Sequence, residues 1–268
     1  MSSPLLNVMS AAAVKAGKGL MRDFGEVSEL QVSRKGPANF VTQSDIRTEK
    51  LLRRELEKAR PDYGFLLEEG GEVPGKDSRY RWVIDPLDGT TNFIHAIPYF
   101  CISIALEERR PNGVVETVAG VIFDPVHNEL FTAEKGKGAL VNGKRLSVSL
   151  RDTLEEAMLV TGNYRFFAPA IRTEALALQA NILQRGTIIR SFGATALDLA
   201  NLAAGRIDVC WYYSFKPWDV AAGLLLLQEA GGIATQLDGQ PAHAYVNALL
   251  ASNRTLHAPM RQLLSEAA

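Results

Sequence analysis

The chain has 268 residues, of which 47% are hydrophobic and 22% are charged, and its 29 basic residues nearly balance its 30 acidic ones. This length and apolar content are enough for a sizeable core and exclude a disordered chain. A formal net charge of −1 argues against a surface built for nucleic-acid phosphates, and no apolar run is long enough to span a bilayer. We therefore expect a globular protein with neither a nucleic-acid nor a membrane partner.

The cysteines and histidines predict neither a disulfide framework nor a zinc site. Cys101 and Cys210 lie in apolar runs and are expected to be buried, reduced thiols. The four histidines are too far apart for zinc-ligand spacing. The apolar stretch at 5–14 lacks the positively charged start of a secretory signal and continues as a helical pattern, which favours a cytoplasmic location.

Apolar periodicity predicts a helix over 4–24 and a second one that starts at the capping signature Thr42–Asp45 and ends before Pro61. Asn142-Gly143 predicts a hairpin turn, because both residues tolerate positive φ. Short apolar runs in this half predict strands at 64–67, 80–84, 100–106, 118–123, 130–133, 139–141 and 146–148.

After about residue 150, strand and helix patterns alternate. We therefore predict an N-terminal α+β half at residues 1–148 with a mostly antiparallel sheet, and a C-terminal α/β half at residues 149–268. The helices expected in the second half are 171–184, 194–204, 218–230 and one from Arg254. The strands expected there are 158–161, 187–191, 208–211 and two short ones before the last helix.

Two aspartates stand at the end of an apolar run, in Asp85-Pro-Leu-Asp88-Gly-Thr. Pro86 is expected to end the strand and Gly89 to allow a tight turn, so that both carboxylates converge on one point. No lysine or arginine lies between residues 83 and 98, and close carboxylates repel unless a cation separates them. Divalent ions with oxygen ligands, above all Mg²⁺, meet that need, whereas ordinary turn formation is the alternative.

Two further acidic positions strengthen the metal interpretation. Glu68 follows a short apolar run and is expected to project from a strand end. Asp219 begins an apolar helix, where a simple N-terminal helix carboxylate is the alternative. Four converging carboxylates would need two or more divalent cations, as in enzymes of in-line phosphoryl displacement. The N–H groups of Gly89 and Thr90 could hold phosphate oxygens, so these residues predict a metal-dependent phosphoryl site.

At these positions the sequence resembles the inositol monophosphatase family, within the lithium-sensitive sugar phosphatases. The resemblance rests on Glu68-Glu69, Asp85-Pro-Leu-Asp88-Gly-Thr-Thr91 and Trp218-Asp219-Val-Ala-Ala-Gly223, in the family's order and with similar intervals. Gly193-Ala-Thr195-Ala196 and Glu229-Ala-Gly-Gly232 extend it over most of the chain. It implies a layered αβαβα sandwich, combining α+β and α/β parts, of the inositol monophosphatase and fructose-1,6-bisphosphatase type.

The resemblance also implies two or three Mg²⁺ ions. Carried over residue by residue, it assigns the first ion to Glu68, Asp85 and the carbonyl of Leu87. It assigns the second ion to Asp85, Asp88 and Asp219, and a weaker third one to Glu68 and waters. The expected reaction is hydrolysis of a small phosphate monoester by direct attack of a metal-activated water.

Thr90, hydrogen-bonded to Asp45, is implied to orient or deprotonate the attacking water together with Glu68. The resemblance further suggests inhibition by Li⁺ in competition with one Mg²⁺. A homodimer is the default expectation for the assembly.

Substrate hydroxyls are implied to contact Asp88, Gly193, Thr195 and Asp219. One position departs from the pattern, because Tyr212 stands seven residues before Asp219, where inositol-active members usually carry a glutamate. Tyr212 is still expected to contact substrate, because a phenol can donate or accept one hydrogen bond, but it brings bulk and no charge. Inositol 1-phosphate is therefore not expected to be the best substrate. A rim or interface aromatic is the alternative for Tyr212.

Other functions remain open on this sequence. A related phosphatase would act on histidinol phosphate, fructose 1,6-bisphosphate or 3′-phosphoadenosine 5′-phosphate. The last of these would call for basic residues to hold a second phosphate, and the near-zero net charge gives no sign of them. A regulatory binding protein that keeps the fold is the alternative from another class. The intact acidic set argues against it, since idle carboxylates packed together cost stability.

Overall fold

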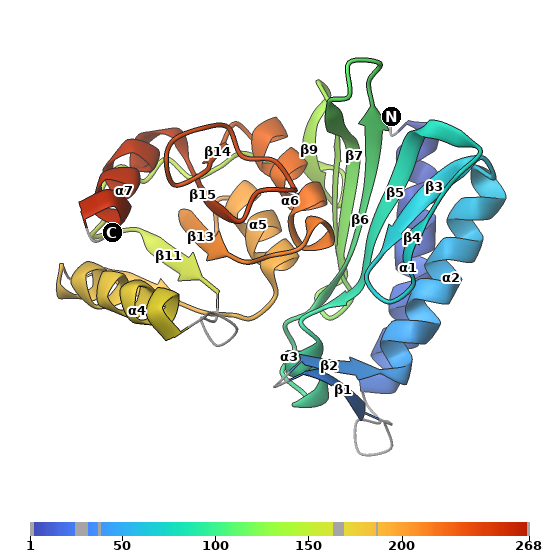
Figure 1. Cartoon of the computed structure of the whole chain (residues 1–268), viewed down its shortest axis with the longest axis horizontal. Coiled ribbons are helices and arrows are strands. Elements are labelled where there is room, and N and C mark those ends of the chain that lie inside the picture. Colours follow the sequence, from blue (N-terminus) through green and yellow to red (C-terminus); the bar gives the residue numbers. More distant parts are fainter. Residues whose placement is uncertain (1–2, 25–31, 37–38, 163–168, 186, 267–268) are drawn as a thin grey trace.

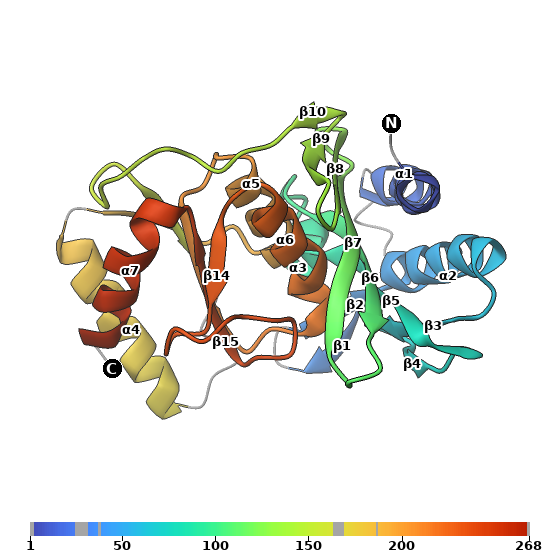
Figure 2. The same ribbon diagram turned by 90° about the horizontal axis from the view of Figure 1, so that it is seen from above.

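The computed structural model describes residues 3–24, 32–36, 39–162, 169–185 and 187–266. Figures 1 and 2 show five layers: a helix pair, a large sheet, a central helix pair, a smaller sheet and an outer helix pair. The layered αβαβα arrangement expected from the sequence is thereby confirmed. Within the described ranges, no helix combines the length and the apolar character needed to cross a membrane.

The first layer consists of α1 (Pro4–Phe24) and α2 (Gln43–Ala59), as the periodicity predicts. The helix α1 buries an apolar stripe that includes Met9 and Leu20 against the large sheet. The helix α2 begins at a capping box, in which the Thr42 hydroxyl accepts the Asp45 N–H and the Asp45 carboxylate accepts the Thr42 N–H at 2.9 Å. This cap holds the buried Asp45 side chain at the N-terminal end of α2.

The large sheet has eight strands in the order β10-β9-β8-β7-β6-β5-β3-β4. All neighbouring pairs are antiparallel except β3 with β5, which confirms the mostly antiparallel prediction. Its strands are β3 (Tyr63–Leu67), β4 (Gly71–Val73), β5 (Asp77–Asp88), β6 (Cys101–Arg109), β7 (Val115–Asp124), β8 (Glu129–Glu134), β9 (Gly138–Val141) and β10 (Lys144–Arg145). The sequence did not predict β4, nor the two-stranded sheet of β1 (Val32–Gly36) and β2 (Asn39–Thr42).

Two boundary predictions in this half were wrong. Pro86 does not end its strand, because β5 continues to Asp88 with a bulge: Asp85 pairs with Ser103 and Asp88 with Cys101. A proline has no N–H to donate, and a bulge leaves one residue outside the ladder, so the strand tolerates it there. The hairpin turn at residues 142–143 is present, but its second strand is β10 rather than 146–148.

The smaller sheet has the order β12-β11-β13-β15-β14. Its strands are β11 (Met158–Thr161), β12 (Ile188–Arg190), β13 (Val209–Tyr213), β14 (Ile233–Thr235) and β15 (Ala248–Ser252). The outer helices α4 (Pro169–Gln184) and α7 (Arg254–Glu266) pack together on its outer face (Figures 1 and 2). Each of these elements overlaps the one predicted from the sequence.

The central helices α5 (Thr195–Ala203) and α6 (Pro217–Glu229) lie between the two sheets (Figure 1). One continuous buried cluster joins these two helices to the inner faces of both sheets. It includes the free thiols of Cys101 and Cys210. The approach is close at Gly120, where a Cβ atom would lie 3.1 Å from Ala222 Cα. The two predicted halves therefore share a core, and α5 and α6 bring C-terminal residues to the inner face of the large sheet.

Candidate active site

The turn after β5 is built by a glycine. Gly89 has φ of +95°, a left-handed conformation that disfavours residues with a side chain. A Cβ atom there would lie 3.0 Å from the Tyr99 carbonyl oxygen and 3.2 Å from Ala194 Cβ. The short helix α3 (Thr90–Ile94) starts immediately afterwards. Gly89 thus lets β5 turn into α3 beside the N-terminal end of α5.

Four acidic side chains interact electrostatically at this turn. Burial raises the pKa of Asp85 well above its ordinary value, and the charges of Glu68, Asp88 and Asp219 raise it further, as does a hydrogen bond to Glu68. Burial likewise raises the pKa of Asp88, with Asp219 as the strongest neighbouring charge. The pKa of Asp219 rises to about 6 through burial, against a lowering hydrogen bond from the Lys216 N–H. Carboxylates from three distant segments therefore share one region.

Backbone groups hold these carboxylates in place. Asp85 is 2% exposed and accepts the Leu87 N–H at 2.9 Å. Asp88 accepts the Ala196 N–H at 2.6 Å, and Asp219 accepts the Lys216 N–H at 2.7 Å. The side chains that could hold a hard cation are thus oxygen donors from the residue after β3, from β5 and from α6. Among the described residues, however, no three His, Cys, Asp or Glu side chains already form a ready-made metal site.

Thr90 and Asp45 form the hydrogen bond that the family resemblance implies. The Thr90 hydroxyl lies 3.2 Å from Asp45 Oδ1 and 3.0 Å from the Leu87 carbonyl oxygen, so both acceptors share its one hydrogen. Asp45 is 1% exposed, and burial raises its pKa although hydrogen bonds from Thr42 oppose the shift. The pair therefore joins the cap of α2 to the first residue of α3.

The predicted substrate residues Gly193 and Thr195, at the start of α5, lie next to the acidic region, because the Ala196 N–H donates to Asp88. Gly193 adopts φ of +86° just before the helix, and Thr195 is the first residue of α5. Asn92 of α3 donates one side-chain hydrogen to the Tyr99 carbonyl at 2.8 Å and another to the Phe192 carbonyl at 2.7 Å. Sequence reasoning missed Asn92, although its place within the motif that follows Asp88 could have indicated a role.

Tyr212 does not lie on a rim, and its hydroxyl is not open to a ligand. The side chain is 3% exposed, and its hydroxyl donates to Asp198 Oδ2 at 2.7 Å. Both the rim alternative and the expectation of a direct contact with a substrate hydroxyl are therefore wrong for this side chain. The hydroxyl finds an acceptor inside the protein because a buried phenol without one would lose its hydrogen bonds to water.

Asp198 is a buried carboxylate that sequence reasoning also missed. It is 1% exposed, and it accepts hydrogen bonds from Tyr99 at 2.5 Å and from Tyr212 at 2.7 Å. Burial raises its pKa to about 7, although both phenols lower it. Its position within the apolar run Leu197-Asp-Leu199 was the available signal, because a charged residue inside a buried helix needs partners.

Asp198 is expected to make stability pH-dependent. In the folded protein the pKa of Asp198 is about 7, above the ordinary 3.8, so the folded state binds this proton more tightly than the unfolded state does. The resulting gain in the free energy of unfolding is fully present below about pH 4 and is lost as the pH rises through 7. Its size is a few kcal/mol, at about 1.4 kcal/mol per pKa unit. Asp198→Asn removes this ionisation. In EDTA, the melting temperature of the variant relative to wild type should therefore be higher at pH 8 than at pH 5, and equal differences would contradict the assignment.

The comparisons agree with this geometry. The family model "Inositol monophosphatase family" matches residues 1–267. An inositol-1-monophosphatase of Caulobacter vibrioides is 49% identical over 262 residues, covering 97% of this chain and 100% of the relative. The Nus factor SuhB of Escherichia coli is 38% identical over 268 residues, covering 98% of each chain.

A solved structure is also similar over the whole chain. The extragenic suppressor protein suhB from Bartonella henselae superimposes with a TM-score of 0.93 at 45% identity. The match covers 99% of this chain and 100% of that one. With the motifs, the layered fold and the full-length family match in agreement, the chain belongs to the inositol monophosphatase family.

Proposed function

We propose that this protein is a magnesium-dependent phosphatase that hydrolyses a small phosphate monoester. The hydrolase class follows from the family, whose members are metal-dependent phosphatases. The observation that carries the proposal is the convergence of Glu68, Asp88 and Asp219 on Asp85, whose pKa is raised first by burial and then by these three charges. Among the described residues, these acidic side chains and the Leu87 carbonyl supply the oxygen donors there, and such donors fit a hard cation such as Mg²⁺.

In the proposed site, Glu68, Asp85 and the Leu87 carbonyl would hold one ion. Asp85, Asp88 and Asp219 would hold a second, and a weaker third would depend on Glu68. When bound, the ions acidify a water and neutralise charge that develops on the phosphoryl oxygens. Burial and the charges of its acidic neighbours raise the pKa of Asp85, and the repulsion among these carboxylates would be relieved at an occupied site.

Thr90 is proposed to position the attacking water. Its hydroxyl hydrogen is directed to Asp45 and Leu87, which leaves the oxygen lone pairs to accept a hydrogen from water. Asp45 fixes this orientation because α2 and its cap hold it rigidly. Glu68 acts with Thr90 as the second acceptor, and the N–H groups of Gly89 and Thr90 would hold phosphate oxygens.

Phosphate release with and without Mg²⁺ tests the proposal. A regulatory protein that retained the fold would fold normally yet release no phosphate in Mg²⁺. A relative at 38% identity carries the name Nus factor, so this alternative is worth the direct test. We expect release that depends on Mg²⁺ and stops in EDTA, and its absence from a normally folded protein would favour the binding function.

The alcohol part of the substrate is proposed to contact Asp88, Asp219 and the segment from Gly193 to Thr195. Position 212 carries a phenol instead of a carboxylate, and its hydroxyl is bound to Asp198, so it does not recognise the hydroxyls of a cyclitol ring. We expect kcat/KM for glycerol 2-phosphate or a nucleotide monophosphate to match or exceed that for inositol 1-phosphate. A large preference for inositol 1-phosphate in this panel would refute the expectation.

Three further properties belong to the same proposal. Li⁺ is expected to inhibit at tens of millimolar (roughly the range of weak hard-cation sites), with less inhibition as Mg²⁺ increases. We propose a homodimer, the commonest closed assembly, which light scattering would test. A cytoplasmic location is proposed because the buried Cys101 and Cys210 are both free thiols.

A further inference from the structure

The first turn of α5 touches the proposed metal site directly. The Ala196 N–H donates to Asp88 Oδ2 at 2.6 Å. This is a strong contact, because a charged acceptor shortens and strengthens an N–H···O bond. The position of Asp88 therefore depends on where the first turn of α5 lies.

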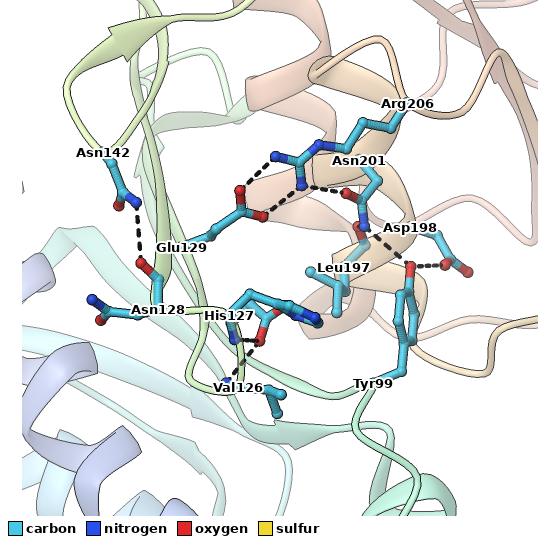
Figure 3. A network of polar contacts seen from close by, with 11 residues as sticks. Tyr99, Val126, His127, Asn128, Glu129, Asn142, Leu197, Asp198, Asn201 and Arg206 are labelled. Carbon is cyan, nitrogen blue, oxygen red and sulfur yellow. Dashed lines mark hydrogen bonds and ion pairs between the residues drawn. The ribbon is translucent and has the colours of Figure 1, made fainter.

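Two residues after Ala196, the Asp198 carboxylate holds this turn in place through hydrogen bonds to both halves of the chain. Its Oδ1 accepts from Tyr99, which lies between α3 and β6 in the N-terminal half, at 2.5 Å. Its Oδ2 accepts from Tyr212 of β13, in the smaller sheet, at 2.7 Å. Figure 3 shows Tyr99 pointing at the Asp198 carboxylate. Each oxygen of one buried carboxylate is thus bound to a different half of the chain.

The same contacts continue along α5 to the large sheet (Figure 3). Tyr99 accepts a hydrogen bond from Asn201 at 3.2 Å, and Asn201 accepts one from Arg206 at 3.0 Å. Arg206 then binds both oxygens of Glu129 at 2.5 Å. Both ends of α5 are therefore fastened to the large sheet, from which Asp85 and Asp88 project.

A buried carboxylate is a costly way to pack an otherwise mostly apolar helix, because its desolvation opposes folding. We propose that Asp198 is a positioning residue: with Tyr99 and Tyr212 it seats the first turn of α5 so that the Ala196 N–H holds Asp88 in place for metal binding. This inference rests on the proposed function. It assigns Tyr212 a part in the reaction that does not require contact with substrate.

The test removes one hydroxyl at a time with Tyr99→Phe and Tyr212→Phe. Each variant is expected to weaken Mg²⁺ binding about tenfold, as loss of a partner behind a metal ligand does, and to lower kcat with little change in KM. Asp198→Ala should weaken Mg²⁺ binding, and Asp198→Asn should weaken it much less, since an amide can accept from one phenol and donate to the other. Tyr245→Phe is the matched control, because Tyr245 makes a similar phenol–carboxylate bond to Glu107 elsewhere.

Two measurements keep the outcome independent of turnover. Calorimetric titration gives the Mg²⁺ affinity, and amide hydrogen exchange reports protection of the Ala196 N–H, which should fall in both phenylalanine variants and not in Tyr245→Phe. Unchanged Ala196 protection, with Mg²⁺ affinity within twofold of wild type, would overturn the proposal. If wild-type protein releases no phosphate while the Ala196 amide still loses protection in the variants, the proposed function fails and the positioning role stands.

Discussion

Asp88→Asn is expected to lower kcat more than about 100-fold while the fold stays intact or gains stability. Loss of a metal ligand should exceed the 10- to 100-fold effect typical of an outer partner. The amide oxygen can still accept the Ala196 N–H, so the packing of α5 on β5 is retained. The substitution also removes repulsion from Asp219, the strongest neighbouring charge that raises the Asp88 pKa. Phosphate release and metal-free thermal unfolding measure the two effects.

The control for this variant is an aspartate on the same strand. Asp77 is at the start of β5, where its carboxylate accepts the Arg79 N–H at 2.8 Å on the surface. Asp77→Asn is expected to leave turnover unchanged. If Asp88→Asn were fully active under the same conditions, the assignment of Asp88 to a metal would be refuted.

Thr90→Ala is expected to lower kcat by about 10²- to 10⁴-fold, the usual range for a lost proton acceptor, with a much smaller change in Mg²⁺ affinity. The Thr90 hydroxyl is directed by Asp45 and lies beside the Leu87 carbonyl, so its removal takes away a group that orients water. The carboxylates of the proposed metal site are untouched. Single-turnover rates and Mg²⁺ titrations separate the two effects.

Two neighbouring substitutions calibrate this result. Thr90→Ser keeps the hydroxyl and should retain most of the activity, whereas Thr91→Ala alters an exposed neighbour and should be nearly neutral. Equal losses of kcat and Mg²⁺ affinity in Thr90→Ala would count against a water-orienting role and would indicate that Thr90 supports the metal ligands instead.

Features governed by local physics could be predicted from the sequence. The helix at 4–24 follows from a repeating apolar stripe, and the start of α2 follows from the reciprocal bonds of Thr42 and Asp45, three residues apart. The turn at Gly89 follows from the freedom of glycine at positive φ. Each of these depends on neighbours within one or two turns of chain.

Features governed by distant partners could not be predicted. Nothing near Tyr212 in the sequence shows that its hydroxyl binds Asp198, because that contact exists only once α5 packs against β13. The bulge that admits Pro86 depends on the register of β5 with β6. The metal assignment is intermediate: the acidic motifs are visible in the sequence, but the resemblance was needed to assign each residue a ligand role, and those roles remain predictions.

The shared central layer has a consequence for biosynthesis. The inner face of the large sheet, with Val83, Ile122 and Phe131, packs on helices that begin only at Thr195 and Pro217. At about 5–20 residues per second, a ribosome needs several seconds to make the intervening stretch. During that interval the nascent sheet presents an apolar face to solvent, and a chaperone that shields apolar surface would be expected to bind it.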